Sequence, residues 1–273
     1  MITSAGNARV KQVVQWQNKA KERKKDGIFL AEGIKMFEEA PTESIVEVFV
    51  SEDLEQKLKS TEVSDTDALY KKKLHETGYE IVADDVFAKM SDTQTPQGIL
   101  TILKRPEYNL DLLLQEENPV FVILENLQDP GNLGTIVRTA EGAGITGVIM
   151  SAGTVDIFNP KTIRATMGSI YRVPFLYVED MADTIQKLHK HGVHTYAAHL
   201  AGKTYYQDVS LKEPTAFLIG NEGNGLTKET ADMAESYIKI PMEGQVESLN
   251  AAVATALLLY EAHRQRHGEI QSK

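Results

Sequence analysis

Alternating apolar and polar stretches give the second half of the 273-residue chain a regular rhythm. From residue 119 onward, short apolar runs of strand length alternate with segments of helical period. The expected strands are FVIL (121–124), GVIM (147–150), PFLYV (174–178), HTYAA (194–198), AFLIG (216–220) and YIKI (237–240). This alternation predicts an α/β fold with a parallel sheet and helices on both faces. Ligands of such sheets gather beyond the carboxyl ends of the strands, so the informative residues should follow strands.

The first hundred residues have a less regular pattern. Residues 7–27 predict one helix, with Asn7 as its cap, Gly27 after its end and the lone Trp16 packed against neighbours. Strands are expected in IFLAEG (28–33), IVEVFVS (45–51), the start of 80–92 and QGILTIL (97–103), with short helices between them. The Pro-bounded stretch 104–119 has no clear period. The pattern therefore predicts a first domain over 1–106, a linker over 107–118 and a second domain over 119–273.

Three polar clusters follow predicted strands of the second domain. In the first, Asp129, Pro130 and Gly131 form a turn, Asn132 occupies the position of a helix cap, and Arg138 follows in the same helix. Their spacing alone does not make Asn132 and Arg138 partners. For these residue types taken alone, a capped helix with one surface arginine is the favoured explanation.

The second cluster is the glycine-rich stretch FLIGNEGNGL. Gly220, Gly223 and Gly225 alternate with polar residues and allow close backbone approach to a flat ligand. The spacing is neither GxGxxG nor a P-loop, which disfavours nucleotide-dependent oxidoreductases and phosphate-cradling NTPases. The carboxylate of Glu222 would repel phosphates and suits a cation or a hydroxyl donor. A tight turn with solvated polar residues is the alternative.

The third cluster opens the last helix. Ile240 ends a strand, a loop follows, and Ser248 or Asn250 is placed to cap the apolar stretch that starts at Ala251. Capping requires only one such residue, yet two stand beside Glu247. Capping therefore explains only part of this cluster.

Composition narrows the possible chemistry. The absence of cysteine excludes disulfides, thiolate metal sites and a cysteine nucleophile. No stretch approaches the roughly 18 apolar residues of a membrane span, and the start lacks a secretory apolar core, so a cytoplasmic protein without membrane contact is expected. The run HKHGVHTYAAH (189–199) raises the possibility of a metal site, but no acid or cysteine completes a set, and no metal is predicted.

Charge is unevenly distributed. The formal net charge is -10, which by itself disfavours a nucleic-acid partner. Residues 1–25, however, carry seven lysines and arginines against the single acid Glu22. This segment is either a docking surface for a phosphate backbone or a solvated helix end.

At the three clusters the chain closely resembles the SpoU-type (TrmH-like) RNA 2'-O-ribose methyltransferases of the SPOUT superfamily. NLGTIVRTAEGAG, FLIGNEGNGL and IPMEGQVESLNAAVATALLLYE match the three motifs of that family in order. FLAEG and TPQGIL in the first domain are similar to the α/β substrate-binding domain often fused ahead of these enzymes, which resembles certain ribosomal proteins.

The resemblance implies a parallel-sheet domain with a C-terminal trefoil knot, S-adenosylmethionine (AdoMet) as cofactor, and a homodimer whose site is completed across the interface. It also implies two sets of residues. The implied cofactor-binding residues are Gly220, Asn221, Gly223, Ile240, Met242, Ser248 and Leu249, and the implied catalytic residues are Asn132, Arg138, Glu222, Ser248 and Asn250.

The resemblance implies methyl transfer to a ribose 2'-hydroxyl, with ribosomal RNA preferred as substrate. A transfer RNA substrate and a non-catalytic RNA-binding or ribosome-assembly protein are the alternatives. An arginine is a poor base, so Arg138 is expected to hold a phosphate and stabilise charge on the 2'-oxygen. Glu222 is expected to orient its neighbours, or to accept the proton if burial raises its pKa.

Overall fold

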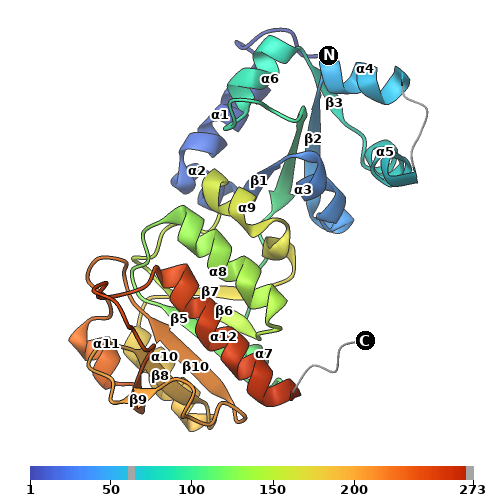
Figure 1. Cartoon of the computed structure of the whole chain (residues 1–273). Coiled ribbons are helices and arrows are strands. Elements are labelled where there is room, and N and C mark those ends of the chain that lie inside the picture. Colours follow the sequence, from blue (N-terminus) through green and yellow to red (C-terminus); the bar gives the residue numbers. More distant parts are fainter. Residues whose placement is uncertain (61–64, 269–273) are drawn as a thin grey trace. The chain divides into compact units, whose positions relative to one another are not determined.

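The computed structural model describes residues 1–60 and 65–268, and the chain forms two compact units (Figure 1). Unit 1 comprises Met1–Glu107 and Asp156–Tyr171, and unit 2 comprises Tyr108–Val155 and Arg172–Lys273. The sequence pattern placed all of 119–273 in one domain, whereas the segment Asp156–Tyr171 groups with unit 1 by its contacts. The assignment of separate substrate-binding and catalytic roles to the two halves stays a prediction.

Unit 1 is built on a four-stranded sheet in the order β1-β4-β2-β3. Its strands are β1 (Ile28–Glu32), β2 (Ile45–Ser51), β3 (Glu80–Val82) and β4 (Ile99–Lys104). β4 runs antiparallel to β1 and β2, and β3 is parallel to β2. The helices of unit 1 are α1 (Ala8–Asn18), α2 (Ala20–Asp26), α3 (Ile34–Glu39), α4 (Glu52–Ser60), α5 (Asp65–Thr77), α6 (Asp84–Met90) and α9 (Pro160–Thr166).

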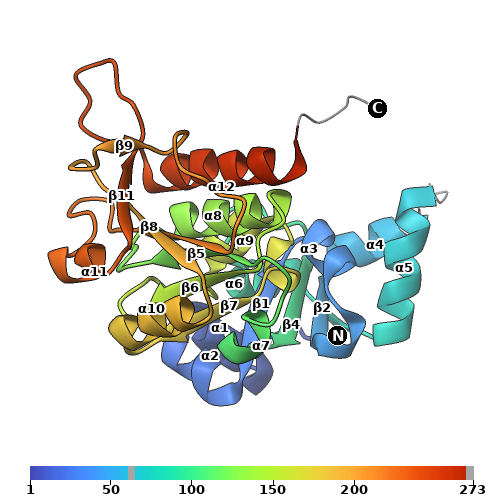
Figure 2. The ribbon, with the colours of Figure 1, turned by 90° about the horizontal axis from the view of Figure 1, so that it is seen from below.

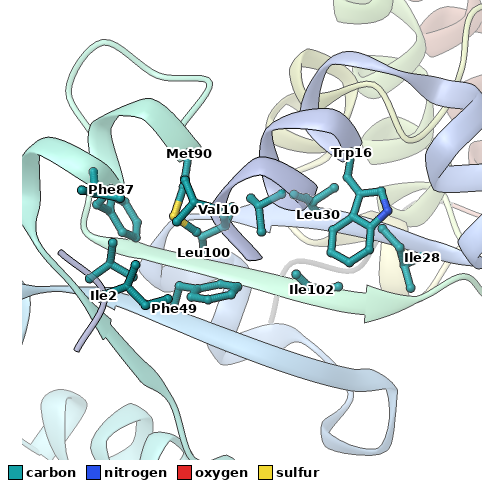
Figure 3. Packing of buried hydrophobic residues seen from close by; sticks show 13 residues of the cluster. Ile2, Val10, Trp16, Ile28, Leu30, Phe49, Phe87, Met90, Leu100 and Ile102 are labelled. Carbon is teal, nitrogen blue, oxygen red and sulfur yellow. The ribbon is translucent and has the colours of Figure 1, made fainter. Parts of the chain in front are cut away.

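Helices cover both faces of this sheet because its strands bury both sets of alternating side chains. Phe49 of β2 belongs to a cluster with Val10 and Trp16 of α1 and Phe87 of α6 (Figure 3). Its neighbour Val50 points to the other face and joins a second cluster with side chains of α3, α4 and α5. The predicted packing role of Trp16 is confirmed, since only 5% of the residue is exposed.

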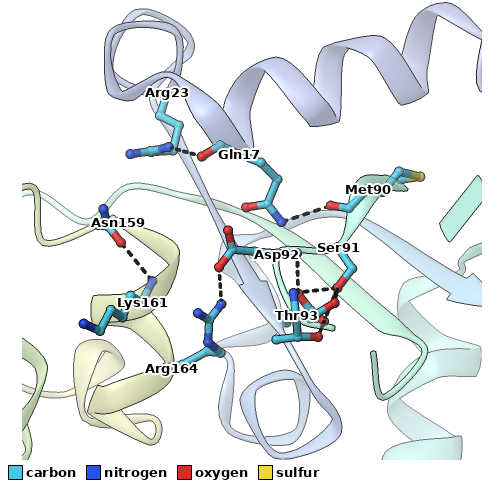
Figure 4. Close-up of polar contacts among 10 residues, drawn as sticks. Gln17, Arg23, Met90, Ser91, Asp92, Thr93, Asn159, Lys161 and Arg164 are labelled. Atoms are coloured by element: carbon cyan, nitrogen blue, oxygen red, sulfur yellow. Dashed lines mark hydrogen bonds and ion pairs between the residues drawn. The ribbon is translucent and has the colours of Figure 1, made fainter. Parts of the chain in front are cut away.

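The predicted single helix over 7–27 is wrong, because the chain leaves the helical conformation at Lys19 (φ -128°, ψ 104°). The cause is the buried Arg23, which donates hydrogen bonds to the carbonyl oxygens of Trp16 (2.5 Å) and Gln17 (3.0 Å). The bond to Gln17 is drawn in Figure 4. In a continuous helix the following turn would use those carbonyls. The cap at Asn7 and the left-handed Gly27 at the end of α2 are confirmed.

Segment Asp156–Tyr171 is tied to the rest of unit 1 by ion pairs at two points. Arg23 pairs with Asp156 at 2.5 Å. Arg164 of α9 pairs with Asp92 at 2.6 Å (Figure 4). Phe158 also packs against Phe29 of β1, with 4.9 Å between ring centroids. Unit 1 therefore depends on residues that lie far along the chain from its other parts.

Unit 2 contains a seven-stranded parallel sheet in the order β7-β6-β5-β10-β8-β11-β9. The predicted parallel α/β fold is confirmed. The strands are β5 (Val120–Leu124), β6 (Gly147–Ser151), β7 (Phe175–Val178), β8 (His194–Ala198), β9 (Thr204–Tyr205), β10 (Thr215–Ile219) and β11 (Ser236–Lys239). Only the two-residue edge strand β9 has no counterpart in the sequence pattern.

Helices cover both faces of this sheet as well (Figure 2). α8 (Pro130–Gly142) and α12 (Ala251–His267) lie side by side on one face. α10 (Met181–Lys190) packs on the other face, where α11 (Lys228–Asp232) also joins the core cluster. The stretch predicted as a linker contains a short helix, α7 (Leu110–Leu113), of which Leu110 and Leu113 join the same cluster together with Leu114. That stretch is thus part of the packed unit.

Candidate active site

A cavity of about 580 Å³ opens in unit 2 at the carboxyl ends of three neighbouring strands. Loops that follow β8, β10 and β11 line it, together with the first turns of α12. Because all strands of the sheet are parallel, these loops meet at one edge. All seven predicted cofactor residues line this cavity: Gly220, Asn221, Gly223, Ile240, Met242, Ser248 and Leu249.

The glycine-rich stretch folds into a tight loop after β10. Asn221 and Gly225 exchange two backbone hydrogen bonds, of 3.0 and 2.9 Å, and Gly225 adopts a left-handed conformation (φ +68°). The side chain of Asn221 accepts hydrogen bonds from the N–H groups of Gly223 and Asn224 and donates one to the carbonyl oxygen of Asn126. Gly220 has no room for a side chain, because a Cβ there would lie 2.0 Å from the carbonyl carbon of Gly225.

Glu222 links this loop to the start of α8. Its carboxylate accepts hydrogen bonds from the N–H groups of Gln128 (3.0 Å) and Asp129 (2.9 Å) and from the side-chain amide of Asn132 (3.0 Å). Asn132 in turn accepts a hydrogen bond from the amide of Asn250 at 2.9 Å. One chain of hydrogen bonds therefore connects all three polar clusters identified in the sequence.

Asn132 does not cap α8 as the sequence pattern predicted. The cap is Asp129, whose side chain accepts a hydrogen bond from the N–H of Asn132 (2.7 Å), and the helix begins at the proline that follows. Proline is suited to the first helical turn, which places the start one residue after Asp129. The amide side chain of Asn132 is thereby free to bridge Glu222 and Asn250. At the last helix Asn250 is the cap, and Ser248 lines the cavity instead.

The pKa of Glu222 is lowered. Partial burial raises it, but the hydrogen bonds from Gln128, Asn132 and Asp129 together outweigh burial and bring it below the usual glutamate value. Glu222 would need a raised pKa to accept a proton at neutral pH, and its pKa is lowered instead. Glu222 is therefore an ionised acceptor that fixes the geometry of its partners.

A stability measurement follows from this shift. A carboxyl whose pKa is lowered by folding stabilises the folded state above its unfolded pKa and loses that contribution as the pH falls through the folded value. We expect Glu222→Gln to lower the melting temperature at pH 7, and the difference from the wild type to shrink as the pH falls below the usual glutamate pKa and through the lowered folded value. The exposed Glu229 of α11 provides the control substitution, Glu229→Gln. A pH-independent difference would contradict the role of the ionised carboxylate.

Arg138 lies apart from this network. It is an exposed residue of α8 and does not line the cavity. Six residues separate it from Asn132, which corresponds to about 9 Å along a helix axis. Within the parts of the chain that the structure describes, it makes no ion pair or side-chain hydrogen bond. The structure therefore brings Asn132, Glu222 and Asn250 together and leaves Arg138 outside their group in one copy of the chain.

Several residues of the site were not predicted from the sequence. The buried Glu125 accepts hydrogen bonds from the N–H (2.7 Å) and the hydroxyl (2.8 Å) of Thr227. It thereby fixes the residue that follows the glycine loop. Gln128 and Asp129 supply two of the donors to Glu222. His199, which follows β8, and Tyr205 of β9 also line the cavity. Glu125, Gln128 and Asp129 could have been found in the stretch ENLQD (125–129), because its polar residues follow β5 directly.

The histidine-rich run does not form a metal site. Across residues 1–60 and 65–268, no three His, Asp or Glu side chains are placed to hold a metal ion. His189, His191 and His194 instead contact Thr195, Lys187 and Glu235 respectively. In the same described parts of the chain, no helix combines the length and the apolar character that crossing a bilayer requires.

Comparison with known proteins gives consistent matches over both units. The model of the SpoU rRNA Methylase family matches residues 119–260, and that of the MRM3-like substrate binding domain matches residues 7–101. The 23S rRNA (guanosine(2553)-2'-O)-methyltransferase RlmP of Bacillus subtilis (strain 168) is 34% identical, over 95% of this chain and 97% of its own length.

Solved structures with bound AdoMet are similar as well. The rRNA methyltransferase from Sinorhizobium meliloti is 31% identical, with a TM-score of 0.81 over 96% of this chain and 97% of that chain. The SpoU methyltransferase AviRb from Streptomyces viridochromogenes is 25% identical, with a TM-score of 0.82 over 96% of this chain and 99% of that chain.

Proposed function

Because the chain belongs to the SpoU rRNA Methylase family, we propose that it is an AdoMet-dependent RNA methyltransferase that acts on a ribose 2'-hydroxyl. The observation that carries the proposal is the hydrogen-bonded convergence of three separate loops beside one cavity. Ribosomal RNA is the proposed substrate class, as the name of the relative RlmP supports. A cytoplasmic location is proposed together with this substrate.

The cavity suits AdoMet in size and chemistry. Its volume of about 580 Å³ lies in the range of small-molecule sites. Ile219, Leu226 and Ile238 offer apolar surface to an adenine ring, and Gly220 also lines the cavity. The carboxylates that line the cavity suit a sulfonium cation; they are Glu222, Glu243 and Glu247.

When bound, AdoMet supplies an activated methyl group, so the protein has to position a weak oxygen nucleophile and manage developing charge. The side-chain amide of Asn132 is hydrogen-bonded to both Glu222 and Asn250, which fixes its orientation. Ser248 lines the cavity and offers a hydroxyl there. Arg138 is proposed to bind the adjacent phosphate of the RNA and to stabilise the negative charge that develops on the 2'-oxygen. A planar guanidinium stays protonated and can donate two parallel hydrogen bonds to such a group.

We further propose that two copies associate through α12. Val253, Leu257 and Tyr260 form an apolar stripe at helical spacing, and each is between 36% and 50% exposed. The neighbouring face of α8 is exposed at Arg138 and Gly142, and Tyr260 lies against Gly142. A second copy that packs on this stripe would cover Arg138, and Arg138 could then act in the active site of that copy. Such a dimer accounts for the distance between Arg138 and the polar network within one chain.

Charge placed in this stripe should separate the copies. Burying one unpaired carboxylate in an apolar interface is strongly unfavourable, so Leu257→Asp is expected to shift the protein from dimer to monomer. Light scattering after gel filtration measures the mass. Leu112→Asp, at an exposed leucine of α7 in the same unit, is the control and should leave the mass unchanged. A wild type that elutes as a monomer would contradict the dimer.

The proposed activity is tested by mapping 2'-O-methyl groups. Ribosomal and transfer RNA from a strain that lacks the protein would be compared with the parent, and purified protein with AdoMet would then be added to the undermethylated RNA. We expect one ribosomal position to lose its methyl group and to regain it in vitro. If the methyl group is lost from and restored to transfer RNA instead, transfer RNA is the substrate. If no methyl group is transferred to either RNA, the result supports a non-catalytic RNA-binding role.

The segment that follows β11 leads from near the edge of the sheet back to its middle. Its loop, residues 240–249, contributes to the cavity beside the glycine loop, and α12 then packs against α8 and the central strand β10. We propose that this segment forms the trefoil knot expected from the family resemblance. Unit 1 is proposed to bind the RNA, in line with its match to a substrate-binding domain.

A further inference from the structure

A group of exposed lysines lies at one end of unit 1. Lys21, Lys24 and Lys25 belong to α2, and Lys19 precedes it. Lys104 joins them through the sheet, since it is paired with Ile28, three residues after Lys25. The five residues form what we call the lysine face: Lys19, Lys21, Lys24, Lys25 and Lys104. The fifth member is about 80 residues away in sequence and becomes visible only in the fold.

These lysines have no partners of their own. Within residues 1–60 and 65–268, none of the five makes an ion pair or side-chain hydrogen bond. Of the two acids in α2, Asp26 accepts a hydrogen bond from the indole of Trp16 at 2.7 Å, and Glu22 is half-buried. Arg23, the arginine of the same helix, is directed inward to Asp156. The positive charge of the face is therefore not neutralised by the protein.

Folding alone does not account for this arrangement. Lys21 and Lys25 are four residues apart on one helix, where like charges destabilise each other. Arg23 holds the helix in place from the buried side with hydrogen bonds to Trp16 and Gln17. In a chain with a net charge of -10, a fixed cluster of unpaired cations is suited to a polyanion.

The composition of the face favours nucleic acid over protein. Protein interfaces are usually anchored by exposed aromatic or large apolar side chains. No residue of α1, α2 or the end of β4 is among the exposed large hydrophobic residues in the described chain. A cationic surface without such an anchor fits phosphates, which are recognised by charge irrespective of sequence.

We propose that the lysine face docks the phosphate backbone of the RNA substrate. The proposal rests on the proposed function in taking RNA as the substrate. In this arrangement the lysines supply affinity and register, and the identity of the modified nucleotide is read elsewhere.

The test is charge reversal in the full-length protein. Lys21→Glu/Lys25→Glu is compared with Lys57→Glu/Lys72→Glu, which makes the same charge change at exposed lysines of α4 and α5. Binding of a fluorescein-labelled RNA hairpin is measured over a series of salt concentrations. We expect at least about tenfold weaker binding for the first variant, and a salt slope lower by about 0.9 for each phosphate that is no longer neutralised. The control variant should match the wild type.

The outcomes separate this proposal from the proposed function. Unchanged affinity and salt slope in Lys21→Glu/Lys25→Glu, or equal losses of affinity in both variants, would overturn the lysine face as an RNA site. Thermal unfolding shows whether either variant is damaged, and Lys21→Gln/Lys25→Gln gives a milder second test. A wild type that binds RNA through these lysines, yet transfers no methyl group, would refute the proposed activity alone.

Discussion

Arg138→Ala is expected to lower the rate of methyl transfer by at least about 100-fold, the usual effect of removing a donor that stabilises developing charge. AdoMet affinity should stay nearly unchanged, because Arg138 does not line the cavity. Single-turnover transfer of labelled methyl groups gives the rate, and calorimetry gives the affinity. Arg172→Ala is the matched control, at an exposed arginine of unit 2 that pairs with Glu141. Full activity of Arg138→Ala would remove the assignment.

A mixing experiment decides whether Arg138 serves its own chain or a second copy. Arg138→Ala and Gly220→Ala carry defects in different parts of the site, so each homodimer would be inactive. If Arg138 acts on the partner's cavity, each hybrid dimer has one intact site, and an equal co-expressed mixture should regain about a quarter of wild-type activity. If Arg138 acts within its own chain, both sites of the hybrid carry a defect and no activity returns. Recovered activity therefore requires a site shared between two copies.

The sequence was informative about the sheet of unit 2 because its strands are buried on both faces. FVIL and AFLIG became β5 and β10, and every residue of these two strands is buried. A short continuous apolar run between turn residues is typical of a strand that is buried on both faces. The positions of the three polar clusters followed from the same logic, since parallel strands present their carboxyl ends at one edge.

The sequence was less informative wherever a distant residue decides a local conformation. The break at Lys19 depends on Arg23 being drawn to Asp156, which lies 133 residues away in sequence. The packing of Asp156–Tyr171 in unit 1 depends in the same way on Arg164 meeting Asp92. Helical period and charge along the chain carry no record of such partners, so a continuous helix and an undivided second domain were the expected solutions.

In the candidate site, some features could be predicted from the sequence and others could not. Glu222, Asn132 and Asn250 were recognised as residues of one site, yet their order of contact and the capping role of Asp129 came only from the fold. The pKa of Glu222 is a further case. The sequence allowed burial to raise it, whereas hydrogen bonds from Gln128 and Asp129 in the β5–α8 connection and from Asn132 of α8 lower it. These donors include two backbone N–H groups, which no sequence motif identifies.

Gly220→Ala is expected to weaken AdoMet binding by at least about 100-fold, equivalent to about 2.7 kcal/mol. The added Cβ would lie 2.0 Å from the carbonyl carbon of Gly225 and 2.1 Å from the nitrogen of Leu226. Both atoms belong to the backbone, so no side-chain rotation relieves the clash, and the two hydrogen bonds between Asn221 and Gly225 have to open. Because this loop forms a wall of the cavity, its displacement acts directly on the bound cofactor. Calorimetry with AdoMet measures the effect.

Gly244→Ala makes the same chemical change where a Cβ meets no atom within 4 Å, and it should keep wild-type affinity. Circular dichroism and thermal unfolding establish whether Gly220→Ala still folds. Asn221→Ala provides a second route to the same loop, because it removes the hydrogen bonds to Gly223, Asn224 and Asn126 without adding volume. Weaker AdoMet binding in both variants, but not in Gly244→Ala, would place the cofactor against this loop. Wild-type affinity in a folded Gly220→Ala protein would instead mean that the cofactor binds away from the glycine loop, and the three-cluster site would have to be abandoned.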